Sequence, residues 1–171
     1  KKSTLLSLKP RIIVCNVDEK SLPDGNKYSN VCKKKLSDEN IIIVCADIED
    51  QIMSLQTKDR KDFMFESGIK STGLDNLIKT GYNTLGLSTF FTSGPEESRA
   101  WTIEKNSKAI DAAGVIHTDF KKKFIRAETV SHKEFIKYKG FHECKNVGKL
   151  RLEGKDYLVN DGDVMYFRVG S

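Results

Sequence analysis

Two short runs of β-branched, apolar residues constrain the fold of the first half of the chain more than any other feature. They are Arg11-Ile12-Ile13-Val14-Cys15 and Ile41-Ile42-Ile43-Val44-Cys45. Unbroken apolar runs of this length are typical of parallel strands that are buried on both faces. The segment between them places apolar residues at helical spacing, which predicts an amphipathic helix over about residues 26–37. The pattern therefore predicts a βαβ unit and an α/β fold for this half.

The rest of the first half is predicted to be helical. A charged segment follows at residues 50–70, and a second apolar stripe covers residues 74–85. Ser71 or Thr72 can cap the start of that stripe, and Gly86 can end it. We therefore place the domain boundary near Gly86, with one domain over residues 1–86 and another over residues 87–171.

The second half alternates strands with short helices. Ser93-Gly94-Pro95 predicts a turn between two strands, residues 109–113 a short helix, and residues 124–130 a further strand. Ser131 and Glu134 form a capping-box pattern at the start of another helix. Asp161-Gly162 predicts a hairpin between residues 157–159 and 164–169. This order describes a small curled sheet that holds a helix, which is an α+β fold of the β-grasp type.

Composition indicates a globular protein. Of the 171 residues, 38% are hydrophobic and 31% are charged, which argues against a disordered chain. No apolar run approaches the roughly 20 residues of a membrane helix, and no signal peptide is evident, so we expect a cytoplasmic protein without a membrane partner. The four cysteines form no C-x-x-C pair and are expected to be free thiols. The net charge of +5 permits an anionic partner such as RNA.

The sharpest candidate site is Asn16-Val17-Asp18-Glu19, directly after the first buried strand. GTPases carry their guanine-reading motif, N-K-x-D, at the same place. Here Val17 replaces the lysine and Glu19 replaces the aspartate, so guanine selection should weaken and adenine should become acceptable. The alternative is that Asn16 is a simple turn former.

A second loop follows the second buried strand. Cys45-Ala46-Asp47 occupies the place at which GTPases carry S-A-K, whose backbone N–H contacts the base. Ligands of parallel sheets bind beyond the carboxyl ends of the strands, so both loops belong to one edge. No G-x-x-x-x-G-K-[ST] motif occurs in the sequence, so the phosphate cradle is absent. We therefore assign no catalytic residue.

Basic residues in the second half form a second candidate surface. A solvated face is the usual explanation for such a run, and phosphate contact with RNA is the functional alternative. The predicted residues are Lys121, Lys122, Lys123, Arg126, Lys149 and Arg151.

Two other features favour a structural role. His117 and Asp119 have no third ligand in a suitable context, so we expect no metal site and a hydrogen-bonded His117 at a helix end. Trp101, Phe90 and Phe91 could stack on bases, but core packing on alternate strand positions is the better interpretation.

Many specific segments of this chain, in order, resemble the YchF / Obg-like ATPase family of P-loop NTPases. The resemblance runs from about Lys9 to Val169 and matches the C-terminal half of the family. The matching segments include Asn16-Val17-Asp18-Glu19, Thr89-Phe90-Phe91-Thr92-Ser93-Gly94-Pro95, Arg99-Ala100-Trp101-Thr102-Ile103, Ala113-Gly114-Val115-Ile116-His117-Thr118-Asp119-Phe120 and Glu153-Gly154-Lys155-Asp156-Tyr157.

The resemblance implies the C-terminal part of an OBG-type nucleotide-binding domain followed by a TGS domain of β-grasp fold. It also implies binding of ATP or GTP with Mg²⁺ in a longer parent chain, slow hydrolysis, and association with ribosomes or structured RNA. Asn16, Val17 and Glu19 would read the base, and Cys45-Ala46-Asp47 departs from the commoner S-A-K form. The chain is expected to be a fragment that is inactive and binds no cofactor by itself.

Two rival functions stay open at this point. The second half is alternatively a non-catalytic interaction module that binds a protein partner. A β-grasp sulfur carrier is a weaker alternative, because such carriers end in Gly-Gly and this sequence ends in Val169-Gly170-Ser171. The sequence makes no prediction of oligomeric state.

Overall fold

The structure is a computed structural model that describes residues 5–37 and 39–170. The chain divides into two compact units, Lys1–Leu85 and Gly86–Ser171, and each is described by itself. Both units combine helices with a β-sheet, so the prediction of a mixed α/β protein is confirmed. Within the described ranges, no helix has the length and apolar character needed to cross a membrane.

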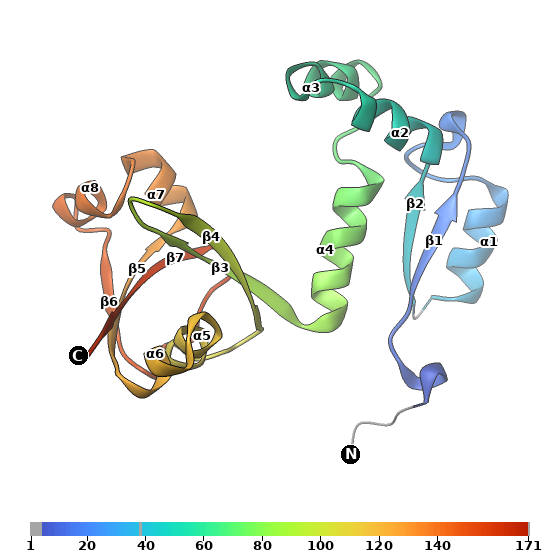
Figure 1. Cartoon of the computed structure of the whole chain (residues 1–171). Coiled ribbons are helices and arrows are strands. Elements are labelled where there is room, and N and C mark those ends of the chain that lie inside the picture. Colours follow the sequence, from blue (N-terminus) through green and yellow to red (C-terminus); the bar gives the residue numbers. More distant parts are fainter. Residues whose placement is uncertain (1–4, 38, 171) are drawn as a thin grey trace. The chain divides into compact units, whose positions relative to one another are not determined.

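A parallel pair of strands, β1 and β2, forms the centre of the first unit (Figure 1). Their register aligns Cys15 with Ile43 and Asn16 with Val44. The helix between the strands begins at Asn26, whose side chain accepts hydrogen bonds from the N–H groups of Tyr28 and Ser29. The predicted strand–helix–strand order is therefore confirmed. The elements of this unit are η1 (Leu6–Leu8), β1 (Ile12–Asn16), η2 (Glu19–Ser21), α1 (Lys27–Lys35), β2 (Asn40–Val44), α2 (Ala46–Ser54), α3 (Thr57–Glu66) and α4 (Gly73–Leu85).

The helix α2 begins at the residue after Cys45, where a polar loop had been expected. The prediction of a loop at Cys45-Ala46-Asp47 is wrong, because Ala46 and Asp47 belong to the first turn of α2. Cys45 offers no side-chain cap, and the side chain of Asn16 accepts the first N–H of the helix instead. The charged segment over residues 50–70 is helical as predicted, in α2 and α3, with a break after Ser54.

The helix α4 is held at its start by two side chains. The Glu49 carboxylate accepts hydrogen bonds from the N–H groups of Gly73 and Leu74, and Thr72 Oγ1 accepts one from Asp75. The predicted cap at Thr72 is confirmed. No local pattern predicts the contact of Glu49, which lies 24 residues from Gly73. Gly86, at the end of the helix, has a φ of 65°, as a terminating glycine requires.

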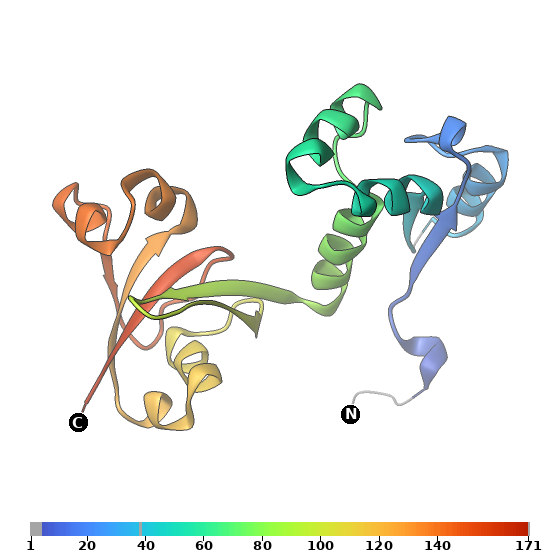
Figure 2. The ribbon, with the colours of Figure 1, turned by 45° about the horizontal axis from the view of Figure 1, so that its top comes forward.

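A five-stranded sheet in the order β4-β3-β7-β5-β6 forms the second unit. The central strand β7 is parallel to β3 and antiparallel to β5 (Figure 2). The elements are β3 (Leu87–Ser93), β4 (Ser98–Glu104), α5 (Ala109–Ile116), α6 (Thr118–Lys122), β5 (Phe124–Ser131), α7 (His132–Tyr138), α8 (Phe141–Asn146), β6 (Arg151–Glu153) and β7 (Asp163–Val169).

The two faces of this sheet have different covers. On one face, Phe90, Met165 and Phe167 pack with the buried alanines of α5 to form the core. The opposite face carries α7 and α8, where the rings of Phe141 and Tyr166 are 6.5 Å apart. Phe90 is fully buried and stacks on Trp101, so the prediction of core packing is confirmed for this pair.

Local sequence signals in this unit have mixed outcomes. The turn between β3 and β4 is confirmed. The cap at Ser131 is confirmed in part: Ser131 Oγ accepts the Glu134 N–H, but the Glu134 carboxylate accepts from the Ser131 hydroxyl, so the described contacts do not include the second bond of a capping box. The helix predicted over residues 109–113 continues through Gly114 to Ile116. The hairpin prediction at Asp161-Gly162 is wrong: both edges of β7 are occupied by β3 and β5, and Leu158 forms a bridge with Lys108 instead.

Candidate functional site

The carboxyl ends of β1 and β2 meet at one corner of the first unit. Asn16 is the last residue of β1, and its Oδ1 accepts a hydrogen bond from the Ala46 N–H at 3.0 Å. The backbone of the next residue, Val17, continues the ladder by donating its N–H to the Val44 carbonyl at 2.8 Å. The structure therefore brings Asn16, Cys45 and Ala46 together, although 30 residues separate Asn16 from Ala46.

The six predicted base-reading residues differ in the solvent exposure of their side chains. Val17 and Cys45 are buried, so they can offer a ligand only backbone atoms. Asn16, Glu19, Ala46 and Asp47 are exposed. Since the Ala46 N–H already donates to Asn16, the polar groups left for a ligand are the amide nitrogen of Asn16 and the carboxylates of Glu19 and Asp47.

A cavity of about 1020 Å³ lies beside this corner within the first unit. Within the described part of the chain, Glu19 is the only one of the six predicted base-reading residues that lines this cavity. The remaining wall combines the apolar residues of β2 with lysines such as Lys20 and Lys79. The cavity and the corner thus share Glu19 but are not one site.

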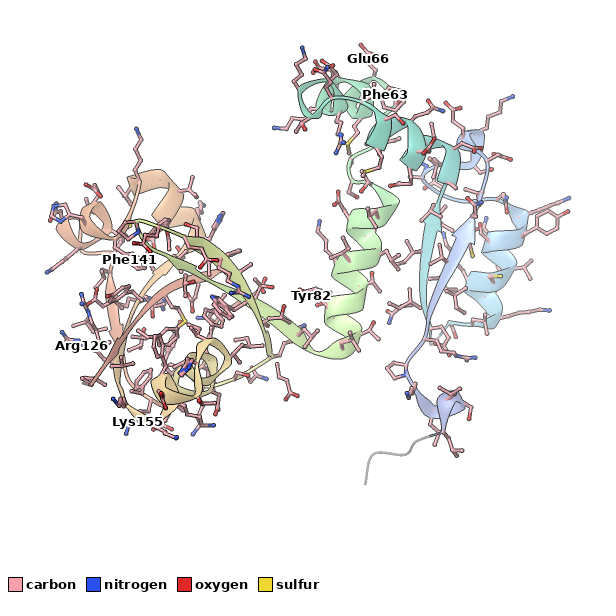
Figure 3. All side chains as sticks on the ribbon, in the orientation of Figure 1. Phe63, Glu66, Tyr82, Arg126, Phe141 and Lys155 are labelled. Atoms are coloured by element: carbon pink, nitrogen blue, oxygen red, sulfur yellow. The ribbon has the colours of Figure 1, made fainter. Side chains whose placement is uncertain are left out.

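The six basic residues predicted for RNA are mostly engaged in ion pairs. Lys121 contacts Asp111 at 2.7 Å, Lys122 contacts Asp119 at 3.8 Å, and Lys149 contacts Glu134 at 3.4 Å. In the described residues, no ion pair is recorded for Lys123 or for Arg126, which lies on β5 (Figure 3). Lys123 and Arg126 are therefore the members of this set best able to meet a phosphate.

Arg151 belongs to a polar network around the buried carboxylate of Asp163. Its guanidinium contacts Asp163 at 3.0 Å, and the Asp163 carboxylate also accepts hydrogen bonds from Tyr157 at 2.7 Å and from the Asn160 N–H at 3.0 Å. Burial raises the pKa of the Tyr157 hydroxyl, and its hydrogen bond to Asp163 adds to the effect. This network fixes the turn that leads into β7.

The sequence reasoning missed one basic residue next to Arg126. Arg168 is the cross-strand partner of Arg126 on β7, and it is exposed. Its guanidinium lies 4.5 Å from the centre of the Tyr166 ring and contacts Glu128 at 2.9 Å. The alternation of exposed Tyr166 and Arg168 with buried Met165 and Phe167 could have identified this face as outward.

His117 has the structural role that the sequence predicted. It caps α6, because its Nδ1 accepts a hydrogen bond from the Asp119 N–H at 3.2 Å. Across the parts of the chain that the structure describes, no group of three or more His, Cys, Asp and Glu side chains could hold a metal ion.

Comparisons with known proteins identify the family. The family model YchF-GTPase_C, described as a protein of unknown function (DUF933), matches residues 87–170. A protein of Bacillus subtilis named ribosome-binding ATPase YchF is 46% identical over 168 residues, which is 96% of this chain and 46% of that protein. The chain belongs to the YchF family. A protein of Escherichia coli O157:H7 that is also named ribosome-binding ATPase YchF is 45% identical to this chain over 166 residues, which is 96% of this chain and 46% of that protein.

A solved structure supports the same assignment. The structure of the Schizosaccharomyces pombe YchF GTPase matches with a TM-score of 0.80 and 33% identity, and the match covers 94% of this chain and 43% of that one. The chain therefore spans less than half the length of the YchF proteins that it matches. The family model matches the second unit alone, whereas the match to the B. subtilis relative also includes the first unit.

Proposed function

We propose that the first unit is the C-terminal part of an OBG-type nucleotide-binding domain, and that its corner contacts the purine base of ATP or GTP. The hydrogen bond between Asn16 and Ala46 carries this proposal, because it joins the end of β1 to the start of α2, the two segments that a base would have to touch. The names of the relatives, which are an ATPase and a GTPase, agree with a nucleotide ligand.

The residues present fit the base and not the phosphates. Asn16 offers an amide donor, and Glu19 and Asp47 offer carboxylate acceptors, which suit the donor and acceptor edge of a purine. The sequence has no phosphate-binding G-x-x-x-x-G-K-[ST] motif and, among its described residues, no cluster suited to a metal such as Mg²⁺. Hydrolysis of a nucleotide is therefore proposed only for a longer protein of this family, and the chain by itself should not catalyse it.

A nucleoside tests the base site without requiring a phosphate site. Adenosine titrated into the isotope-labelled chain should shift the amide resonances of Asn16 and Ala46 at millimolar concentration. Uridine, which presents a smaller and different edge, should shift them less. The Asn16→Ala variant should lose the response. Equal responses to adenosine and uridine, or none to either, would refute the base site.

We propose in addition that the second unit is a TGS domain of β-grasp fold that contacts the ribosome through RNA, in the cytoplasm. The five-stranded mixed sheet with α5 on its core face supports the fold. The relatives are named as ribosome-binding proteins. Lys123 and Arg126 are the proposed phosphate contacts, and Arg168, Lys121, Lys122 and Lys149 are in ion pairs that an RNA would have to displace.

A salt titration distinguishes RNA contact from a protein-binding module. Binding of ribosomal RNA should weaken steeply as salt rises, and Lys123→Ala and Arg126→Ala should each reduce the log–log slope by about 0.7 to 0.9. Lys58→Ala, a change on α3 of the other unit, serves as the matched control and should leave the slope unchanged. Binding that ignores salt, or no binding to RNA at all, would favour the protein-binding alternative.

A further inference from the structure

Two of the four cysteines approach each other in the first unit, although they lie on different elements. Cys15 is on β1 and Cys32 is on α1, and both are partly exposed free thiols. Their side chains lie close enough for Cys32 to raise the pKa of the Cys15 thiol. The other two cysteines, Cys45 and Cys144, are buried.

The burial pattern of α1 explains why Cys32 faces the sheet. Ser29 is buried, whereas Tyr28 and Val31 are exposed, and Cys32 and Leu36 are half-buried. Residues 29, 32 and 36 follow helical spacing, so they form the inward stripe of α1. Cys32 therefore sits one helical turn beyond Ser29 on the covered side of the helix.

The register of the strands places Cys15 on the face that α1 covers. Cys15 is the cross-strand partner of Ile43, and such partners project on the same face of a sheet. Gly25, just before α1, lies against the side chains of both Ser29 and Ile43. Val14, the neighbour of Cys15 in β1, is exposed on the other side. Strand and helix thus present the two thiols to each other from independent elements.

We propose that Cys15 and Cys32 form an oxidative modification site, in which a peroxide converts the two thiols to a reversible intramolecular disulfide. A disulfide requires two sulfurs that can reach each other, and Cys15 and Cys32 lie on the face of β1 and the stripe of α1 that cover each other. The bond would fasten α1 to β1 at the residue immediately before Asn16. This inference does not depend on the proposed nucleotide or RNA functions.

The chemistry proceeds in two steps. A thiolate attacks one peroxide oxygen, the O–O bond breaks, and a sulfenic acid and hydroxide form. The second thiolate then attacks the sulfenic sulfur, the S–S bond forms, and the S–O bond breaks to release hydroxide. The two sulfurs are oxidised, the peroxide is reduced, and the two thiol protons leave with the oxygens as two molecules of water.

The surroundings assign different parts to the two thiols. Burial raises the pKa of the Cys15 thiol, the neighbouring Cys32 raises it further, and the charge of Lys33 opposes both effects. Cys15 is therefore slow to form a thiolate on its own. Cys32, next to Lys33 and Lys34 at the end of α1, is assigned the first attack, and Cys15 resolves the sulfenic acid.

The test uses the full chain and hydrogen peroxide, followed by alkylation of the remaining thiols and digestion with trypsin. Oxidation should remove two of the four thiols and should link the tryptic peptide of residues 12–20 to that of residues 28–33. Dithiothreitol should separate the two peptides. Cys45 and Cys144 in the same sample serve as internal controls. Both are buried, so peroxide should leave them as free thiols, which the alkylating reagent then labels once the protein is denatured.

Variants extend the test to the order of attack. In Cys15→Ser, Cys32 should accumulate as a sulfenic acid that a dimedone probe labels, and no linked peptide should form. In Cys32→Ser, labelling of Cys15 should be slower. The proposal is overturned if the oxidised wild-type chain keeps both thiols, oxidises them separately, or links them between two chains. The wild-type peptide map decides this outcome even if a variant fails to fold.

Discussion

Arg151 donates a hydrogen bond to the Asp163 carboxylate at 3.0 Å, and only 3% of that carboxylate side chain is exposed. The bond ties β6 to the first residue of β7, a strand that is not its neighbour in the sheet. Arg151, which the sequence analysis assigned to RNA contact, therefore stabilises the fold of the second unit.

Replacing Arg151 should therefore affect stability before it affects any ligand. Arg151→Met leaves the buried Asp163 carboxylate without its cationic partner and should lower the free energy of unfolding by about 2 kcal/mol. Urea denaturation of the second unit measures the change. Lys149→Met removes a more exposed ion pair, with Glu134, and should cost less than about 1 kcal/mol. Equal effects of the two changes would contradict the assignment.

Two glycines of α4 should respond to alanine in opposite directions. A Cβ at Gly73 would meet Val44 Cγ1 at 2.6 Å, so Gly73→Ala should destabilise the first unit by about 1–3 kcal/mol. A Cβ at Gly81 would meet nothing within 4 Å, so Gly81→Ala should stabilise it by about 0.5–1 kcal/mol through helix propensity. Thermal unfolding of both variants against wild type checks the sign of each change.

The contact between Ser131 and Glu134 at the start of α7 should make the stability of the second unit depend on pH in the acid range. The hydrogen bond from Ser131, with help from Lys149, lowers the pKa of Glu134 below its usual value of 4.5. A carboxylate with a lowered folded-state pKa stabilises the fold above its unfolded pKa, and this contribution disappears as the pH falls through the folded pKa. Glu134→Gln should therefore be less stable than wild type at about pH 6, and the difference should shrink as the pH falls below the usual pKa of 4.5. Melting temperatures across this range measure it, and a difference that stays constant with pH would rule out the ionic contribution.

The link between the two strand ends can be tested apart from any ligand. Asn16→Ala removes the acceptor for the first N–H of α2 and should cost about 1 kcal/mol. Asn16→Asp retains an oxygen at the same place and adds a favourable charge at a helix N-terminus, so it should keep most of the stability. If both variants lose the same stability, the hydrogen bond is not what supports the corner.

Short-range patterns predicted much of the fold. The apolar runs at β1 and β2 and the cap at Ser131 are local signals, because each depends on residues a few positions apart. The hairpin at Asp161-Gly162 failed because its partner strand is chosen by the whole sheet, and β7 pairs with β3 and β5 instead. Turn chemistry describes how a chain reverses, but it does not say which strand lies alongside.

The candidate site was predictable in part. The segments that follow two adjacent parallel strands begin at the same edge of the sheet. The proximity of Asn16 and Ala46 therefore followed from the strand pattern. The ion pairs did not, because Arg151 and Asp163 meet only through the path of β6 and β7. Charge in a sequence shows that a residue can bind an anion, and only the fold shows whether an acidic neighbour already occupies it.

The position of β7 has a consequence for synthesis of the protein. This strand follows the other four strands of its sheet in the chain, yet it lies at the centre of them. During translation, β3, β4 and α5 emerge before the strand that must separate β3 from β5. The sheet of the nascent second unit therefore stays incomplete, with Phe90 and Phe124 exposed, until β7 itself has left the exit tunnel and inserts between β3 and β5.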